Sequence, residues 1–300
     1  MQIANHLQSG TAVKNIQPAH IPFSPYQPDS ISSDDTSSQF SPLREYRISR
    51  HPKSNPNPAT GTDCLLQRNG YSIHLVSSLK QCIKASTLIK RMYASRGYQT
   101  ESTSVFLYTP NQFTFLALIG DIIAGTVTLR IDSEEGLLAD ELYSQEINNF
   151  RARGKKVCEL SKFALDPQYS SKEIIASLFQ AAYIYARDIG KATDFFCEVN
   201  PRHTAPQKRM FGFRQIGEKK TCPRVNAPAV LLHLDTKYIE EQIASIGEHP
   251  DRKEKNLYPY FFPLRKEKEI VQFIQARQTH FTPTIHKANS YYHPKYFQPI

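Results

Sequence analysis

A carboxylate and a hydroxyl stand two positions apart, at Glu159 and Ser161, inside the apolar stretch Val157–Leu165. The stretch is rich in β-branched, aromatic and aliphatic residues and ends at Asp166-Pro167, a pattern that predicts a central β-strand. Because side chains alternate between the faces of a strand, we expect Glu159 and Ser161 to share one face. Burying both groups is costly unless they have partners or perform chemistry. Glu159 is therefore either an acid or base in a reaction, or a structural acid paired with an arginine.

The pattern before the central strand predicts strands and helices from alternation, capping residues and a turn signal. In chain order these are a strand over Tyr71–Val76, a helix from Ser77 or Ser78 to about Arg96, strands over Phe113–Ile119 and Ile122–Ile131, and a helix over Asp140–Ala152. The Gly120-Asp121 pair between the two long strands is typical of a hairpin turn.

The strongest helix signal of the chain follows the central strand. Ser170 and Glu173 match a capping box, apolar residues then recur at helical spacing, and Gly190 ends the pattern. The remaining predicted elements are a strand over Asp194–Val199, a short helix from Thr204 (in a capping box with Gln207) to Gly212, and strands over Phe213–Ile216 and Ala229–Leu234. This order predicts an α+β fold with three layers (α/β/α) and a mixed sheet.

Composition divides the chain near residues 66 and 242. Residues 1–66 are rich in Ser, Pro, Asn, Gln and Thr without an apolar period, which predicts a disordered arm or a docking tail. Residues 67–242 contain the predicted sheet and helices. Residues 243–300 are basic and rich in aromatic residues and Pro, so we expect a poorly packed extension with one short helix over Glu267–Gln278, or a segment that binds a partner.

The charge and the cysteines exclude several classes of protein. The 37 Lys and Arg outnumber the 28 Asp and Glu, for a net charge of +9, which favours an acidic partner. No dense basic run occurs, so nucleic acid is not expected. No stretch has the roughly 18 apolar residues that a membrane span needs, and the N-terminus lacks a secretory pattern, so we expect a cytoplasmic protein without a transmembrane segment. The 5 cysteines form no CxxC pair, so neither a disulfide framework nor a metal site is indicated.

Three stretches carry a resemblance to a known family: Gly136–Tyr143, Val157–Asp166 and Cys222–Leu232. Together with the element order, they are similar to the FeeM-type N-acyl amino acid synthases, which implies a GNAT-like acyltransferase fold with a mixed, mostly antiparallel sheet. The central stretch also resembles the Glu-x-Ser-Arg-Phe strand of the autoinducer (acyl-homoserine-lactone) synthases, with Lys162 in place of the Arg. The resemblance covers roughly residues 70–240.

The resemblance implies transfer of a long fatty acyl group from an acyl carrier protein to the amino group of an amino acid. The donor is then the phosphopantetheine thioester of the carrier protein, and no cofactor stays bound. Because the product is a lipid, contact with a membrane surface is a further possibility. Glu159 becomes the candidate general base, and Ser161 orients a water or the acceptor, unless it is a core hydroxyl bonded to backbone. Arg130 binds the acceptor carboxylate or pairs with Glu159. Asp132 and Asp140 are candidates for the acceptor ammonium, with solvated loop carboxylates as the alternative.

The loop Asp166–Lys172, before the long helix, contains no glycine. Acetyl-CoA enzymes of this fold carry a glycine-rich loop whose backbone N–H groups hold the pyrophosphate, so its absence favours a carrier-bound pantetheine arm with a single phosphodiester. Lys162 joins the site only if the strand is bulged, and Ser170 is alternatively just a helix cap. The predicted donor-binding residues are Lys162, Phe163, Ser170, Ser171, Lys172, Asn200, Arg202 and His203.

One position departs from the pattern that the resemblance implies. Pro206-Gln207 stands where many GNAT enzymes have a tyrosine that protonates the leaving thiolate. His203 is a candidate acid or base, because the ordinary pKa of histidine is near neutrality, or else an exposed loop residue. A thiolate leaves without much help, so the acyltransferase hypothesis stands, with a less active or inactive relative still open. The alternatives are an autoinducer synthase and a non-catalytic protein that binds acyl chains or a carrier protein.

Overall fold

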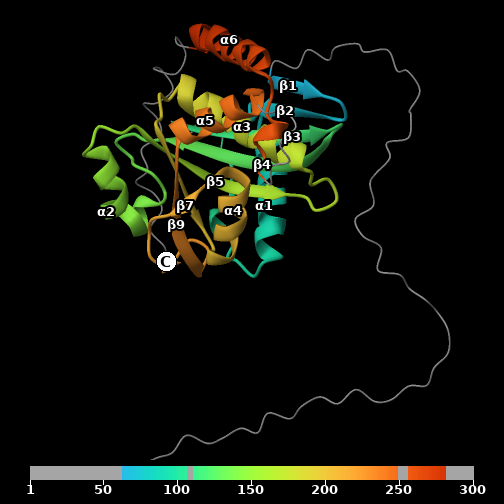
Figure 1. Cartoon of the computed structure of the whole chain (residues 1–300). Helices are drawn as coiled ribbons and strands as arrows, with labels where there is room; N and C mark the ends of the chain where they lie inside the picture. Colours follow the sequence, from blue (N-terminus) through green and yellow to red (C-terminus); the bar gives the residue numbers. More distant parts are fainter. Residues whose placement is uncertain (1–62, 107–110, 249–255, 282–300) are drawn as a thin grey trace, which may run out of the picture. The chain divides into compact units, whose positions relative to one another are not determined.

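The computed structural model describes residues 63–106, 111–248 and 256–281, which Figure 1 draws in colour. The predicted disordered arm therefore lies outside the described residues, except for its last four. Those residues belong to or adjoin a first strand, β1 (Cys64–Arg68), which the sequence analysis did not predict. Short runs such as β1 have too few residues for a clear alternation.

The strands form one large sheet. Its other members are β2 (Tyr71–Leu75), β3 (Gln112–Ile119), β4 (Ile122–Ile131), β5 (Val157–Leu165), β6 (Asp194–Val199), β7 (Arg214–Gln215), β8 (Lys220–Cys222) and β9 (Ala227–Asp235). The strand order is β1-β2-β3-β4-β5-β6-β9-β7, with β8 paired to β9. Neighbours are antiparallel except β5 and β6, which are parallel. The predicted mixed, mostly antiparallel sheet is thus confirmed.

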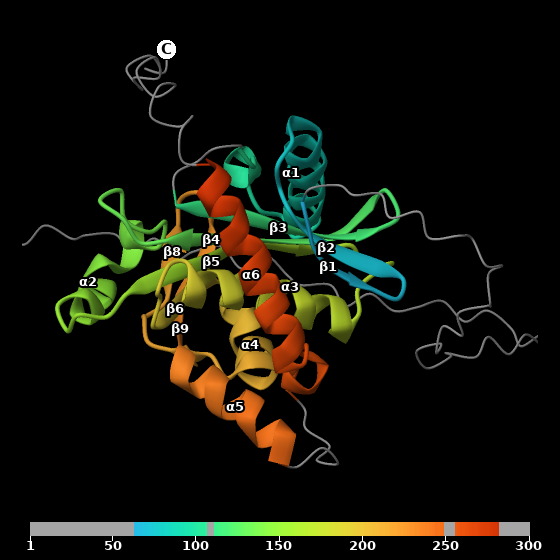
Figure 2. The same cartoon turned by 90° about the horizontal axis from the view of Figure 1, so that it is seen from above.

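Helices cover both faces of the sheet, as Figures 1 and 2 show. On one face, α3 (Lys172–Asp188) packs against the strands with a nearly continuous buried stripe. On the other face, α1 (Leu79–Ala94) and α2 (Asp140–Arg151) form two smaller apolar clusters with the sheet. The three layers of the prediction are therefore present. The further helices are α4 (Thr204–Phe211), α5 (Thr236–Glu248) and α6 (Leu264–Phe281), and short turns form at η1 (Glu101–Thr103), η2 (Pro201–His203) and η3 (Tyr258–Tyr260).

Two predicted helix caps differ in the structure. Ser171 caps α3 by accepting a hydrogen bond from the backbone N–H of Ile174 at 3.2 Å, so the cap lies one residue later than the predicted Ser170. Thr204 does not cap α4, which has no side-chain cap, and its hydroxyl is buried without a partner among the described residues. Adjacent serines offer the same hydroxyl, and the sequence alone does not choose between them.

A bulge in β5 interrupts the alternation of its side chains. Thr128 of β4 pairs with Ser161, while Thr126, two residues earlier, pairs with Ala164, so β5 holds one residue more than β4 across this interval. Lys162 takes up the extra length in the left-handed region, with φ of 49°. A bulge of this kind redirects the side chains around it. Simple alternation therefore ends at Ser161, and the bulge that would bring Lys162 into the site is present.

The parallel pair β5 and β6 is joined over a short distance only. The register runs from Val157 opposite Asp194 to Glu159 opposite Phe196, whereas β5 continues to Leu165 and β6 to Val199. Beyond Glu159, β5 keeps its pairing with β4, and β6 keeps its pairing with β9. The two strands therefore part at the position of Glu159, in the middle of the sheet.

The expectation of a poorly packed C-terminal extension is wrong for residues 256–281, which we call the C-terminal strap. Leu257, Tyr258, Phe262, Ile270 and Ile274 of the strap are buried in the main core. Helix α5 also runs through the predicted boundary at residue 242, and α6 is longer than the predicted 267–278. Scattered aromatic residues give no periodic signal, although their burial is as favourable as that of a regular stripe. Among the described helices, none has the length and apolar character needed to cross a bilayer.

Candidate active site

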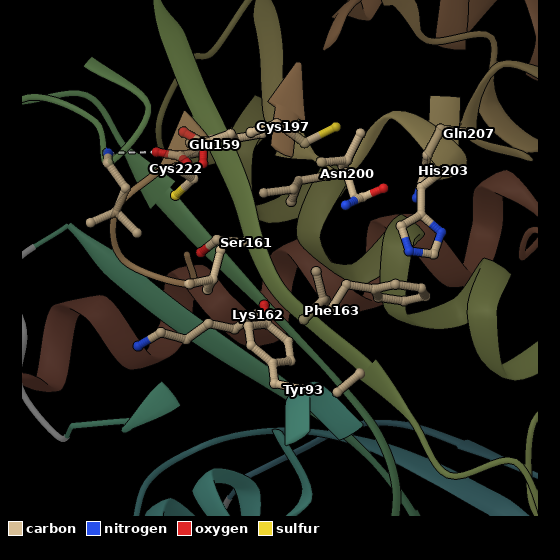
Figure 3. Close-up of a pocket in the computed structure, with 18 of the residues that line it drawn as sticks. Tyr93, Glu159, Ser161, Lys162, Phe163, Cys197, Asn200, His203, Gln207 and Cys222 are labelled. Carbon is tan, nitrogen blue, oxygen red and sulfur yellow. Dashed lines mark hydrogen bonds between the residues drawn. The ribbon is translucent and has the colours of Figure 1, made fainter. Parts of the chain in front are cut away.

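A cavity of about 620 Å³ lies where β5 and β6 part. Its walls include Leu160–Leu165 of β5, Cys197–Val199 of β6, Tyr93 of α1, and Pro206, Gln207, Met210 and Phe211 of α4. In Figure 3, Glu159, Ser161 and Cys222 lie at one side of this cavity, and Asn200, His203 and Gln207 at the other. Consecutive residues of β5 reach the cavity because the edge of β5 beyond Glu159 is not paired with β6, and because the bulge takes Lys162 out of the simple alternation.

Glu159 lies in the cavity wall at the point where the strands part, and only 2% of its surface is exposed. Its Oε2 accepts hydrogen bonds from the backbone N–H groups of Leu138 (2.6 Å) and Ala139 (3.2 Å), in the turn before α2. Burial raises the pKa of Glu159 from 4.5 to about 7, and the charge of Glu198 adds to the rise, while the two N–H donors oppose it. A carboxyl group with this pKa can accept a proton at neutral pH.

Arg130 lies directly opposite Glu159 in the sheet register, but among the described residues no hydrogen bond or ion pair joins the two. Its guanidinium instead contacts the side-chain oxygen of Gln112 (3.3 Å), the carbonyl of Gly136 (3.4 Å) and Glu135 (3.9 Å). The predicted alternative, in which Arg130 neutralises Glu159, is therefore not formed. Arg130 lines the cavity and remains available to an anionic ligand.

Two polar atoms of the cavity wall are buried without a hydrogen-bond partner among the described residues: Oγ of Ser161 and Nε of Arg130. Leaving a buried polar atom unpaired costs about 1–3 kcal/mol, so such atoms usually indicate a missing partner. The alternative interpretation of Ser161 as a core hydroxyl bonded to backbone is not what the structure shows.

Lys162 joins the cavity because of the bulge, as the sequence analysis required. Its Nζ donates to the carbonyl of Ser104, and burial lowers the pKa of Lys162, with a further contribution from the charge of Arg130. Phe163, the next residue, also lines the cavity. The bulge thus brings a hydroxyl, an ammonium and an aromatic ring to one wall.

The turn after β6 contributes the predicted Asn200 and His203 to the cavity. Asn200 Oδ1 accepts from the backbone N–H of Arg202 at 3.2 Å, which starts η2. Arg202 is exposed and donates to the hydroxyl of Tyr98 at 2.6 Å, so it lies beside the cavity without lining it. Burial lowers the pKa of His203, and the nearby Arg202 and Arg96 lower it further, so this histidine is neutral near pH 7.

Besides Arg202, five of the predicted site residues lie outside the cavity. Arg151 of α2 binds Asp132 through two hydrogen bonds (2.7 and 2.8 Å) and Asp140 through two more (both 2.7 Å). Such bidentate pairs satisfy both carboxylates, which leaves them little capacity for an acceptor ammonium. The other three residues, at the start of α3, are Ser170, Ser171 and Lys172. Ser171 is occupied as the helix cap, and the ammonium of Lys172 lies 5.8 Å from the centroid of the Tyr260 ring.

The cavity wall also holds a charged pair that was not predicted from the sequence, Glu198 and Arg224. Arg224 contacts Glu198 at 2.8 Å, donates to the carbonyl of Leu138 at 3.0 Å, and also pairs with Glu141. It therefore ties the turn that holds Glu159 to the β6 side of the cavity. A signal existed, because Arg224 belongs to the stretch Cys222–Leu232 that carries the resemblance, but no chemistry was assigned to it.

The cavity thus combines a buried proton acceptor (Glu159), two cations (Arg130 and Lys162) and a hydroxyl without a partner among the described residues (Ser161), at the point where two parallel strands part. This arrangement suits an acyl transfer in which an amine attacks a carbonyl group held between the strands. The three-layer fold, the parted pair and the bulged central strand define a GNAT-like acyltransferase.

The comparisons with known proteins make this assignment more specific. The family model described as "N-acyl amino acid synthase FeeM" matches residues 84–235. The solved structure of FeeM, an N-acyl amino acid synthase from uncultured soil microbes, matches with 28% identity and a TM-score of 0.52, over 56% of this chain and 92% of that chain. No curated protein sequence matches the chain. The chain belongs to the FeeM N-acyl amino acid synthase family and is an acyltransferase.

More distant solved structures share less of the sequence. The AHL synthase LasI has 11% identity and a TM-score of 0.40, over 55% of this chain and 89% of that chain. An acetyltransferase of the GNAT family from Streptococcus pneumoniae has 16% identity and a TM-score of 0.38, over 54% of this chain and 98% of that chain.

Proposed function

We propose that this protein transfers a long fatty acyl group from the thioester of an acyl carrier protein to the amino group of an amino acid, in the cytoplasm. The observation that carries the proposal is the position of Glu159, buried and free of an arginine partner, where the strands part around the cavity. FeeM, which has 28% identity to this chain, is an N-acyl amino acid synthase.

The charges of the cavity wall support an amino acid as the acceptor. A zwitterion needs an anionic partner for its ammonium and a cationic partner for its carboxylate, and both signs are present. Glu159 supplies the negative charge, because Glu198 is already paired with Arg224, and Arg130 and Lys162 supply the positive charge. Arg130 has a buried Nε without a partner among the described residues, which makes it the best candidate for the acceptor carboxylate.

The proposed reaction proceeds by direct attack of the neutral amine on the thioester carbonyl. A carbon–nitrogen bond forms, the carbon–sulfur bond breaks, and the sulfur leaves as the thiolate of the carrier's arm. Glu159 takes the proton that the nitrogen loses, and the thiolate gains a proton from solvent or from a group in the cavity. Ser161 has a free hydroxyl with which to hold the acceptor or a water between the amine and Glu159.

The loop before α3 supports a carrier-bound donor over free coenzyme A. It has no glycine between Asp166 and Lys172, and its Asp166 is tied to Arg91 at 2.6 Å and to the backbone N–H of Gln168 at 3.1 Å. Such a loop offers few free N–H groups for a pyrophosphate, whereas a carrier's arm brings one phosphodiester. The partners proposed are therefore an acyl carrier protein and an amino acid.

The test is to incubate the protein with acyl carrier thioester and single amino acids, and to follow free carrier thiol and the N-acyl product by mass spectrometry. We expect thiol release that depends on the amino acid. Glu159→Gln should cut turnover by about 10²-fold or more, the scale of a lost general base. Glu134→Gln, which replaces an exposed carboxyl, is the control. Retained carrier binding without thiol release would select a non-catalytic binding protein instead.

A further inference from the structure

Three aromatic rings form one wall of the cavity. Phe179 of α3, Phe211 of α4 and Phe213 after it all line the cavity and are at most 4% exposed. Phe179 and Phe211 are stacked, with ring centroids 4.0 Å apart, and Phe213 meets both edge-on at 6.3 and 6.5 Å. We call these three residues the aromatic wall. It carries no polar atom, so the part of a ligand that it contacts is apolar.

The C-terminal strap lies directly behind this wall. Its backbone N–H at Leu257 donates to the carbonyl of Met210 at 3.0 Å, and the hydroxyl of Tyr258 donates to the carbonyl of Phe211 at 2.8 Å. Both acceptors belong to residues that line the cavity. The ring of Phe261 lies 6.1 Å from the ring of Phe179, on which it packs. The strap thus touches the aromatic wall from outside the cavity.

The strap is itself firmly attached to the core. Gln180 of α3 binds the backbone of Phe262 twice, at 2.6 and 3.3 Å, and Arg187 of α3 pairs with the buried Glu267 at 2.6 Å. Figure 2 shows α6 lying across α3. An element held at this many points defines a fixed position for the rings in front of it.

The strap stands outside the part of the chain that matches the family. The match ends at residue 235, whereas the aromatic wall at Phe179, Phe211 and Phe213 falls inside it. The wall is therefore a part of the matched domain, and its support lies beyond the match. A support that contacts a cavity wall from behind affects where that wall can stand.

We propose that the C-terminal strap sets the depth of the acyl-binding end of the cavity, and so the longest fatty chain that the enzyme accepts, with Phe261 as the specificity-determining contact. This inference depends on the proposed function, because it takes the aromatic wall to meet the end of the donor's acyl chain. Phe261 prevents the ring of Phe179 from moving outward. Without it, Phe179 can move into the space that is vacated, and the cavity becomes deeper.

The test measures kcat/KM for a series of saturated acyl carrier thioesters that lengthen by one ethylene unit at a time. In Phe261→Ala, we expect the preferred chain to become longer, with the ratio of a longer chain to the wild-type optimum raised about tenfold, the scale of discrimination that a methylene pocket provides. Ile270→Ala is the matched control, because it removes a buried apolar side chain of the same strap but leaves the contact between Phe261 and Phe179 in place. It should lower the melting temperature and leave the ratio unchanged.

Two results would overturn the inference: an unchanged ratio in Phe261→Ala, or an equal change in Ile270→Ala, which would indicate general loosening. Should Phe261→Ala fail to fold, Phe261→Leu takes its place, and an unchanged ratio there counts in the same way. A wild-type protein that releases no thiol from any carrier thioester would instead refute the proposed function. The two failures are therefore distinguishable.

Discussion

We expect the buried carboxyl of Glu159 to lower the free energy of unfolding near neutral pH. Replacing it with a side chain that cannot ionise should reveal the size of this effect. Burial raises the pKa of this carboxyl from 4.5 to about 7. A raised pKa means that the folded state binds the proton more tightly than the unfolded state does. The free energy of unfolding is therefore highest below pH 4.5 and falls as the pH rises toward 7, where the folded protein loses that proton.

The size of this effect follows from the two pKa values. A tenfold change in proton binding is worth about 1.4 kcal/mol, so a rise from 4.5 to about 7 corresponds to about 3 kcal/mol. Glu159→Gln cannot ionise, and its side-chain oxygen can still accept from the backbone N–H of Leu138. Relative to wild type, the variant should therefore gain about 3 kcal/mol of stability between acid and neutral pH.

The assay is urea denaturation followed by circular dichroism at a series of pH values, for wild type and Glu159→Gln. Glu134→Gln, at an exposed carboxyl, is the control and should show a difference from wild type that hardly depends on pH. In parallel, wild-type kcat/KM should fall about tenfold for each pH unit below about 7, because only the ionised carboxylate accepts a proton. A stability difference between Glu159→Gln and wild type that is the same at all pH values would refute the assignment of Glu159 as a buried acid with a raised pKa.

Four further variants test the surroundings of this acid. Glu198→Gln should move the acid limb of the pH profile of kcat/KM to lower pH, because the charge of Glu198 helps to raise the pKa of Glu159. Arg224→Met should move that limb to higher pH, because the charge of Arg224 lowers the pKa of Glu159. Ser161→Ala should lower kcat while raising the free energy of unfolding by about 1 kcal/mol, as it removes a buried hydroxyl without a partner, and melting curves beside rate measurements check both. Asp132→Asn should cost about 1 kcal/mol of stability and leave KM for the amino acid unchanged, because its carboxylate binds Arg151 and does not line the cavity.

Elements with a strong local signal could be predicted from the sequence. The Gly120-Asp121 turn joins β3 and β4, and the apolar period after residue 171 forms α3, because turn geometry and helical spacing are properties of short stretches. The burial of Glu159 also follows from local pattern, since a polar residue in an apolar central strand has nowhere else to point.

Features that depend on distant contacts could not be predicted. Asp132 and Asp140 are drawn away from the cavity by Arg151, which reaches them from the far end of α2. The strap reaches the core through pairs such as Gln180 and Phe262, which are 82 positions apart in the chain. The local sequence around either aspartate or Phe262 does not indicate its partner, because ion pairs and aromatic contacts need only proximity in the folded state.

The bulge, the parted strands and the buried acid depend on one another. Because the extra residue at Lys162 is absorbed on the side of β4, β5 keeps its pairing with that strand up to Leu165. On the side of β6, pairing stops at Glu159, and the space that opens is the cavity. Glu159 is consequently the last residue held between the strands, so it is buried deeply enough for its pKa to rise and yet borders the space that a substrate would enter. Without the extra residue, simple alternation would place Lys162 on the opposite face of the strand.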